Sequence, residues 1–315
     1  MQKHFLKYLV DPKTGEDLTW EGDYLVSPSN KYPVVRGVPR FAGYKDDANY
    51  TKSFGYQWNK WSKIQFDSMN IGKKMEGYTL MMWDRITHVL DKDLHNKVIV
   101  DIGCGPGRYI ETVRDKNGIA IGLDLSDAVE AAGEIFAKDP NVLICQADVL
   151  HSPIRPNSVD GVFSVGVLHH TANPKKGFSE MVKILRPGGW IALSVYGLGG
   201  YYDNFFVNVW RKIFKFLWPV FGHFPPLIYS YAVVYFSKLI LKIPVIRTLA
   251  RPFMSFFPFM NIKDIDWSVL NTFDSVTPSN QSGHTMHEVF HWFKNEGLRD
   301  IEPSNWWGTS LHAKK

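Results

Sequence analysis

The chain has 315 residues, 45% of them hydrophobic and 21% charged, and a formal net charge of +5 at pH 7. This composition is typical of a globular protein with a sizeable core, in one large domain with additions or two modest ones, and the mild charge permits an anionic substrate or membrane surface without requiring either. Its two cysteines, Cys104 and Cys145, have no metal-ligand residues near them in the sequence, and the first residues carry no secretory signal; we therefore expect a cytoplasmic protein without a disulfide framework or a structural zinc site.

Residues 1–43 have the pattern of a small separate module. Two short strand-like runs, Tyr24–Val26 and residues 32–35, are separated by turn-forming residues. We expect a β ribbon that serves for packing or dimerisation, with a simple N-terminal hairpin as the alternative. Residues 44–90 are then expected to form a helical cover that leads into the first strand of the core.

A buried strand predicted over Val98–Ile102 runs directly into a turn that contains Gly103, Gly105 and Gly107. Glycines at this spacing let the backbone approach a ligand closely, and the helix that begins at Arg108 offers free N–H groups at its start. A dinucleotide fingerprint has the spacing G-x-G-x-x-G, whereas here the third glycine comes one residue earlier.

Strand-like segments that end in acidic residues follow this turn. The second strand ends at Asp124, about 20 residues beyond the glycines, where a carboxylate is placed to bind ribose hydroxyls. The third ends at Asp148, the fourth spans residues 159–165, and the fifth spans residues 190–195. Strands that alternate with helices predict a parallel sheet over a core domain of residues 91–197.

Residues 198–275 are expected to form a helical insertion. Over Asn204–Leu217, Arg211 and Lys215 fall on a predicted polar face, and Ile213 falls on an apolar face. We expect these helices to form a substrate lid; the alternative is a basic amphipathic surface that contacts membrane through residues 204–242. Residues 276–315 should then form a capped helix and the two closing strands.

The ordered features over residues 98–195 resemble those of class I methyltransferases that use S-adenosylmethionine (SAM), in particular the methyltransferase type 11 domain. The resemblance implies a Rossmann-like α/β fold: a doubly wound, seven-stranded, mostly parallel sheet whose last two strands are antiparallel and follow the insertion. Residues 1–43 resemble a zinc-ribbon module in which Asp11-Pro12-Lys13-Thr14 stands in place of the metal-binding C-P-x-C, so no zinc site is expected there.

The resemblance implies SAM as cofactor, S-adenosylhomocysteine (SAH) as product and no metal. In this family the acid at the position of Asp148 faces the adenine amino group. The residues expected to bind the cofactor are Asp101, Gly103, Cys104, Gly105, Gly107, Asp124, Leu125, Asp148, Val149 and Val165.

Methyl transfer requires a nucleophile held in line and a dry site, and it requires a base only when the acceptor must lose a proton. His169 and His170 follow the fourth strand and are candidates for that base, with a structural role as the alternative. The candidate substrate contacts are Tyr56, Trp58, Tyr201, Tyr202 and His284.

The aromatic residues outside the core predict a small, largely hydrophobic metabolite as acceptor, methylated on oxygen, nitrogen or carbon. A nucleic-acid partner is not expected, because the basic residues are spread among apolar ones instead of forming a dense patch. The alternatives are a catalytically silent scaffold that binds a partner protein and, behind it, an RNA methyltransferase. A homodimer and a location at the membrane periphery are further expectations.

Overall fold

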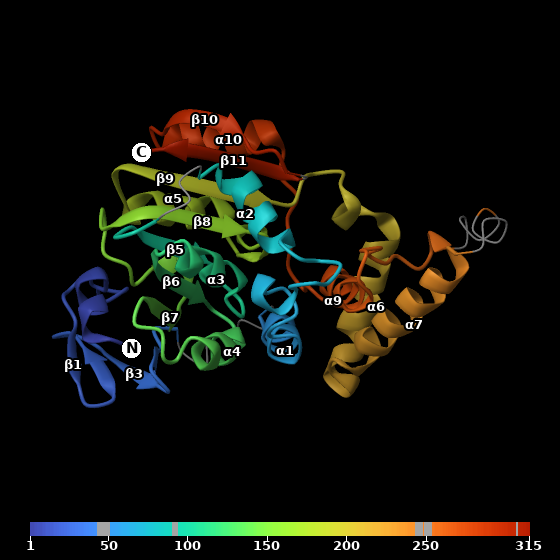
Figure 1. The fold of residues 1–315 in the computed structure, drawn as a ribbon, viewed down its shortest axis with the longest axis horizontal. Coiled ribbons are helices and arrows are strands. Elements are labelled where there is room, and N and C mark those ends of the chain that lie inside the picture. The colour runs from blue at the N-terminus through green and yellow to red at the C-terminus, as the bar shows by residue number, and fades with distance from the viewer. Residues whose placement is uncertain (43–50, 90–93, 243–247, 249–253, 307) are drawn as a thin grey trace.

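The computed structural model describes residues 1–42, 51–89, 94–242, 248, 254–306 and 308–315; the first residues of the predicted helical cover, its last residue and part of the predicted insertion therefore lie outside the described residues. A seven-stranded sheet forms the centre of the molecule, in the order β10-β11-β9-β8-β5-β6-β7 (Figure 1). Its strands are β5 (Val98–Ile102), β6 (Ile119–Asp124), β7 (Val142–Gln146), β8 (Val159–Val165), β9 (Leu185–Val195), β10 (Arg299–Pro303) and β11 (Thr309–Lys314).

Neighbouring strands from β5 to β9 pair in parallel, and β11 pairs antiparallel with both β9 and β10. The predicted fold class, a doubly wound and mostly parallel sheet, is confirmed. The parallel strands are buried on both faces, as β5 illustrates: Ile99 packs into one apolar cluster, and its neighbours Val98 and Val100 pack into another.

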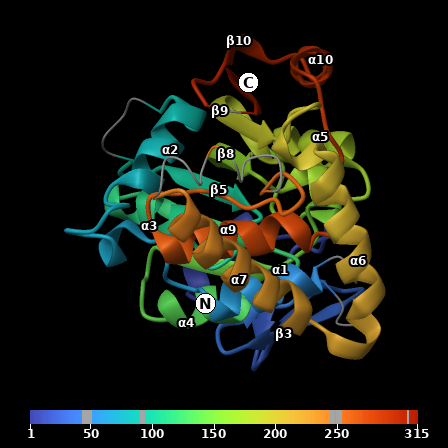
Figure 2. The same ribbon diagram turned by 90° about the vertical axis from the view of Figure 1, so that its right-hand side faces the viewer.

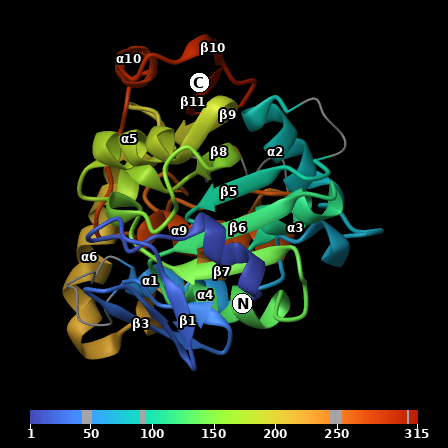
Figure 3. The same ribbon diagram turned by 90° about the vertical axis from the view of Figure 1, so that its left-hand side faces the viewer.

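Helices cover the two faces of the sheet, as Figure 3 shows from the side of the N-terminal module. The first apolar cluster includes side chains of α2 (Tyr78–Thr87), α3 (Arg108–Asp115) and α4 (Ala128–Ile135). The second includes side chains of α5 (Pro174–Ile184) and α10 (Met286–Asn295). Short 3-10 helices are η1 (Lys3–Tyr8), η2 (Asp67–Met69), η3 (Val149–His151), η4 (Leu168–His170) and η5 (Tyr201–Asp203).

The N-terminal residues form a separate four-stranded antiparallel sheet beside β7 (Figure 1). Its strands are β1 (Thr19–Glu21), β2 (Tyr24–Val26), β3 (Lys31–Val35) and β4 (Val38–Pro39). Arg40 pairs with Gln146 in a parallel bridge, and the N–H of Phe41 donates to the carbonyl of Gln146 at 2.8 Å. The module is therefore hydrogen-bonded to the end of the strand at the edge of the main sheet.

Asp11 joins the loops of this module through its carboxylate. The carboxylate accepts hydrogen bonds from Ser27 Oγ (2.5 Å), Asn30 Nδ2 (2.8 Å), Tyr32 Oη (2.7 Å) and the backbone N–H of Lys13 (2.8 Å). Burial opposes ionisation and raises the pKa of this carboxyl, but the four hydrogen bonds outweigh burial and lower the pKa to about 2. An ionised carboxylate thus joins the loops of this module through its hydrogen bonds.

Replacing Asp11 should therefore destabilise the module in a pH-dependent way. The pKa of Asp11 falls from 3.8 to about 2 on folding. We therefore expect Asp11→Asn to lose roughly 2 kcal/mol of stability relative to wild type near neutral pH. Because the folded-state pKa is lowered, this contribution is present above the unfolded pKa and is lost as pH falls through the folded value. Urea unfolding across that pH range measures it, with the exposed Asp23→Asn as control. A difference between wild type and Asp11→Asn that does not narrow in acid would contradict this account.

The segment between β9 and α10 forms a helical unit at the opposite end of the molecule from the N-terminal module (Figures 1 and 2). It contains α6 (Phe205–Phe221), α7 (Phe224–Ile240) and α9 (Ile265–Val276), which share an apolar cluster of their own. Helix α1 (Lys52–Lys60) packs against both α4 and α9 and so joins this unit to the main sheet. Among the described residues, no helix is both long and apolar enough to cross a membrane.

Helix α6 does not bury the face that its sequence predicts. Arg211, placed on the polar face, is buried, whereas Ile213, placed on the apolar face, is exposed. The physical reason is hydrogen bonding: the guanidinium of Arg211 donates to the carbonyl of Ser275 at 2.7 Å and to that of Tyr202 at 3.2 Å. A cation that satisfies carbonyl groups of two neighbouring segments is stable inside the protein, and a hydrophobic periodicity alone does not reveal this.

Candidate active site

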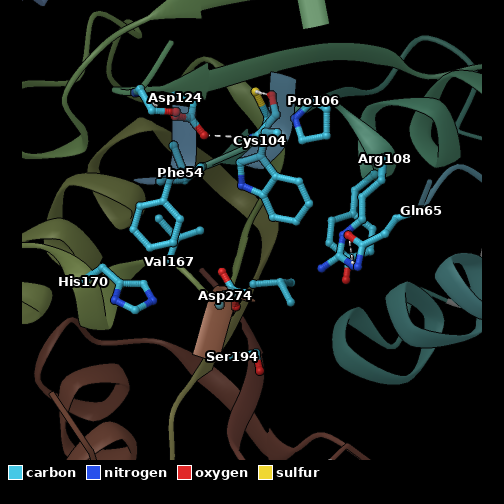
Figure 4. Close-up of a pocket in the computed structure, with 18 of the residues that line it drawn as sticks. Phe54, Gln65, Cys104, Pro106, Arg108, Asp124, Val167, His170, Ser194 and Asp274 are labelled. Atoms are coloured by element: carbon cyan, nitrogen blue, oxygen red, sulfur yellow. Dashed lines mark hydrogen bonds between the residues drawn. The ribbon is translucent and has the colours of Figure 1, made fainter. Parts of the chain in front are cut away.

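A cavity of about 310 Å³ lies at the carboxyl ends of the parallel strands. The order in which strands are added to the sheet reverses here, because β5 pairs with β6 on one side and with β8 on the other, and open α/β sheets bind ligands at such a switch point. Figure 4 shows the glycine-turn residues Cys104 and Pro106 on one side of the cavity, and Asp274 and Ser194 facing them. The volume lies within the range of small-molecule sites, about 300–1,000 Å³.

The glycine turn is shaped by close packing and by backbone torsion. Gly103 has φ 79°, and a Cβ at this position would lie 2.3 Å from a methyl group of Val167. Gly105 also has positive φ, and its N–H donates to Asp124 Oδ2 at 2.8 Å. A side chain at Gly103 would therefore strain the backbone and collide with the loop after β8.

Asp124 stands at the end of β6 with both carboxylate oxygens held in place. Oδ1 accepts hydrogen bonds from the N–H (2.8 Å) and the hydroxyl (2.6 Å) of Ser126, while Oδ2 accepts the bond from Gly105. Burial raises the pKa of Asp124, and the hydrogen bonds from Ser126 and Gly105 oppose that shift. The result is a fixed acidic group in the cavity wall beside the glycine turn.

The two other acids predicted to bind the cofactor differ in position. Asp148 lines the cavity, and its Oδ1 accepts a hydrogen bond from the N–H of Leu150 at 2.9 Å. Asp101 is 2% exposed and lies outside the cavity wall, and its Oδ2 has no hydrogen-bond partner among the described residues. Burial raises the pKa of Asp101 well above its usual value, with the charge of Arg108 opposing the shift.

Most of the residues predicted to bind the cofactor line this single cavity. Gly107 and Asp101 are the exceptions and lie outside the cavity wall. Gly107 instead packs against the ring of Phe136, which a Cβ at this position would approach to 2.5 Å. The predicted residues in the cavity wall are Gly103, Cys104, Gly105, Asp124, Leu125, Asp148, Val149 and Val165.

The two histidines after β8 have different surroundings. His170 lines the cavity, and its Nδ1 lies 2.8 Å from the carbonyl oxygen of Asn280, so Nδ1 carries the proton and Nε2 is left as an acceptor. Burial lowers the pKa of His170 to about 4 and that of His169 well below its usual value, so both rings are neutral at physiological pH. His169 is fully buried against the ring of Tyr196, with ring centroids 3.7 Å apart, and does not line the cavity.

Of the predicted substrate contacts, Trp58 and Tyr202 line the cavity. Tyr56 instead stacks on His223 with ring centroids 4.0 Å apart, and Tyr201 packs edge-on against Tyr202. His284 is buried between Ser282 Oγ (2.8 Å) and Glu288 Oε1 (3.0 Å), away from the cavity wall.

The sequence prediction missed the side of the cavity that faces the glycine turn. Asp274 projects from α9 and accepts a hydrogen bond from Gln57 Nε2 at 2.8 Å. Burial raises the pKa of Asp274, while the bond from Gln57 and the charge of Arg211 oppose the rise. Arg108 and Gln65, joined at 2.8 Å, form another part of the wall (Figure 4). No motif marks Asp274, because α9 begins 70 residues after the end of β9.

The cavity fits the cofactor that the sequence predicts. Positive φ and the lack of a side chain at Gly103 leave room along the turn, and the carboxylates of Asp124 and Asp148 face the same space. Among the described residues, no three His, Cys, Asp or Glu side chains form a group able to hold a metal ion.

The central strands are similar to a known family of protein domains. Residues 100–193 match the family model described as a methyltransferase domain. This match confirms the prediction of a SAM-dependent methyltransferase domain over the strands that carry the glycine turn and Asp124. The match ends before the helical unit and begins after the N-terminal module.

The chain is 32% identical over 126 residues to a tRNA (carboxymethyluridine(34)-5-O)-methyltransferase of Mus musculus, an alignment that covers 39% of this chain and 18% of that protein. It is 29% identical over 203 residues to a tRNA U34 carboxymethyltransferase of Pseudoalteromonas atlantica, covering 57% of this chain and 62% of that protein. The chain thus spans less than two thirds of either relative. It is also similar to a solved structure of Haemonchus contortus phosphoethanolamine N-methyltransferase 2 with SAM, at 19% identity and a TM-score of 0.46, covering 86% of this chain and 47% of that one.

These relatives correct the expected acceptor. A small hydrophobic metabolite as substrate, with nucleic acid unlikely as a partner, is wrong, because both curated relatives are named for action on tRNA. Aromatic walls did not distinguish the two acceptors, since nucleobases also stack on such rings. The spread of basic residues along the sequence was likewise a weak criterion, because folding decides which of them share a surface.

The fixed carboxylate of Asp124 supports a prediction on cofactor binding. Asp124→Ala should weaken the binding of SAH by about 1–3 kcal/mol, because it removes charge-assisted hydrogen-bond acceptors and frees the N–H of Gly105. Isothermal titration with SAH measures the loss, and the exposed Glu134→Ala on α4 serves as control. Unchanged affinity in Asp124→Ala would remove this residue from the cofactor site.

Proposed function

We propose that this chain transfers a methyl group from SAM to a base of an RNA, with tRNA as the RNA class. The observation that carries the proposal is the cavity wall: Asp124 is fixed against the glycine turn within the segment that matches the methyltransferase family. The tRNA class is supported by the names of the two curated relatives.

In this proposal the cofactor lies along the glycine turn, with Asp124 as acceptor for ribose hydroxyls and Asp148 toward the adenine ring. SAM, when bound, supplies an activated methyl group on a sulfonium that leaves as a thioether. Trp58 covers this region, since its ring lies 3.4 Å from the position that a Cβ of Gly105 would occupy. The ring excludes water from that side of the cavity, which favours methyl transfer.

The acceptor base would enter the part of the cavity that faces the turn. Enzymes that modify a base within a folded nucleic acid take it out of its stack and hold it between aromatic side chains. Tyr202 and Tyr196 line this part and stack on each other, with centroids 3.7 Å apart and planes 3° apart. Trp267 and Trp306 contribute further aromatic wall.

Asp274 is the candidate base for an acceptor that must lose a proton. Its carboxylate lies in the wall across from the glycine turn and is oriented by Gln57, so it can accept a proton from an acceptor held between the two (Figure 4). His170 is neutral and presents Nε2 as a hydrogen-bond acceptor, which suits it to orient the nucleobase of the methyl acceptor. We assign proton removal to Asp274 and orientation to His170.

The other parts of the chain take supporting roles in this proposal. Residues 1–43 act as a metal-free ribbon that packs on the core, residues 44–90 and 198–275 provide the cover and the acceptor side, and residues 276–315 complete the sheet. Two buried, unpaired cysteines support a reducing, cytoplasmic location.

The proposal is tested by incubating the protein with methyl-labelled SAM and total tRNA. We expect label in the nucleic acid that is released as a methylated nucleoside by nuclease digestion, and none when the tRNA is digested beforehand. A parallel reaction with an extract freed of nucleic acid should stay unlabelled. Binding of SAH without transfer to any RNA, or label in the extract alone, would contradict the RNA acceptor.

Asp274→Asn tests the assignment of the base. We expect the rate constant of transfer to fall by about a hundredfold or more while the affinity for SAH stays unchanged. In wild type, the rate should rise with pH through a pKa above that of an ordinary aspartate, because burial raises the pKa of Asp274 and only the ionised form accepts a proton. The variant should lack this rise, and the exposed Asp266→Asn on the same helix should keep it. A pH profile that is identical in Asp274→Asn would rule out this role.

A further inference from the structure

Helices α6 and α7, which the structure describes throughout, contribute no side chain to the cavity wall. They form a hairpin whose turn, at Gly222 and His223, lies on the side of the molecule remote from β10 and α10 (Figures 1 and 2). The proposed methyl transfer therefore leaves the outer face of this hairpin without a role.

The turn of this hairpin carries a dense group of exposed apolar side chains. Phe216 is 83% exposed, Val220 77%, Phe221 56%, Phe224 63% and Ile228 50%, all within 13 residues of sequence. We call these five residues the hairpin tip. Soluble proteins seldom leave so many large apolar side chains together in water. Such a group marks an interaction surface for a protein, a membrane or a ligand.

The charged residues in the chain segment that contains the hairpin tip have one sign. Residues 204–263 contain eight Lys or Arg residues and no Asp or Glu. Lys212 and Lys215 are exposed on α6 within one or two turns of Phe216, whereas Arg211 is buried in hydrogen bonds to carbonyl groups. The tip is thus an apolar surface flanked by cations. It is complementary to a partner that has an apolar interior and an anionic surface.

We propose that the hairpin tip docks on the surface of an anionic phospholipid bilayer, with its apolar side chains among the acyl chains and Lys212 and Lys215 among the lipid phosphates. An interfacial helix of this kind buries an apolar face at the boundary of the bilayer while its cations contact anionic lipids. Neither helix crosses the membrane, in agreement with the lack of a spanning helix among the described residues.

A bilayer explains the composition of the tip better than RNA does. Val220 and Ile228 are aliphatic, gain nothing from a surface of phosphates and riboses, and offer no planar group on which a base could stack. Phosphate binding by RNA would also use more exposed cations than Lys212 and Lys215 supply. The apolar side chains outnumber the exposed lysines beside them.

Docking at the tip would also position the active site. His223, in the hairpin turn, stacks on Tyr56 of α1, and α1 contributes Phe54 and Trp58 to the cavity wall. The tip and the cover of the cavity therefore belong to one packed unit.

Flotation with phospholipid vesicles tests the proposal on the full chain. The wild-type protein should float with vesicles of phosphatidylcholine mixed with phosphatidylglycerol, less with phosphatidylcholine alone, and less at high salt. The triple variant Phe216→Ser, Val220→Ser, Phe224→Ser should lose about tenfold or more of the bound fraction. The double variant Lys212→Glu, Lys215→Glu should lose the preference for phosphatidylglycerol.

The control is a matched triple variant at exposed apolar residues elsewhere, Met69→Ser, Ile71→Ser and Phe290→Ser. It should float like wild type.

Two outcomes would overturn the proposal. The first is a wild-type protein that floats with neither vesicle, and the second is an equal loss of floating in the tip triple and in its matched control. If the wild type ignores vesicles, a tip triple that fails to bind total tRNA, or that turns a dimer into a monomer, identifies RNA or a second copy of the chain as the partner instead. Titration with SAH checks that the tip triple is folded. If it is not, hydrogen exchange of residues 216–228 in wild type decides: anionic vesicles should slow it, and unchanged exchange would contradict docking. Because tRNA methylation is measured without lipid, its failure and the failure of docking are separate results.

Discussion

The hydrogen bond from the N–H of Gly105 to the carboxylate of Asp124 is the interaction on which the site depends. It joins the turn after β5 to the end of β6, so the glycines and the acid keep a fixed relation while the remainder of the cavity is built from distant segments. The carboxylate is held at its other oxygen by Ser126, which fixes its rotation. A methyl donor bound along this turn would therefore meet a preorganised group rather than a mobile one.

The side of the cavity that faces the glycine turn has a different origin. Helix α9 brings Asp274 to the wall, and Arg211 of α6 secures the end of α9 through the carbonyl of Ser275. The buried cation and the nearby tyrosines Tyr196 and Tyr202 make this region polar within an aromatic enclosure. Such surroundings suit a planar acceptor with a few hydrogen-bonding groups, as a nucleobase is, as well as they suit an apolar ring.

The two additions to the sheet contrast in how they are stabilised. The N-terminal module is organised by the hydrogen bonds of one carboxylate, Asp11, and by pairing with Gln146 at the end of β7. The helical unit has an apolar core of its own and an apolar exterior at the tip of its hairpin. One addition is hydrogen-bonded to the edge of the main sheet, while the other leaves apolar side chains exposed at its tip.

The sequence by itself determined the succession of strands along the chain, the glycine turn and the acid that ends β6, because these features depend on short-range patterns: continuous apolar runs, glycine spacing and residues next to a strand. The third strand was predicted to end at Asp148, but β7 ends at Gln146, two residues earlier. The sequence did not determine the cavity wall around Asp274, the burial of Arg211 or the removal of Tyr56, Tyr201 and His284 from the cavity. Each of these is settled by contacts between segments far apart in the chain, such as Gln57 with Asp274 and Tyr56 with His223. Helical periodicity placed Arg211 in water, and only the tertiary structure supplied the two carbonyl groups that make its burial favourable.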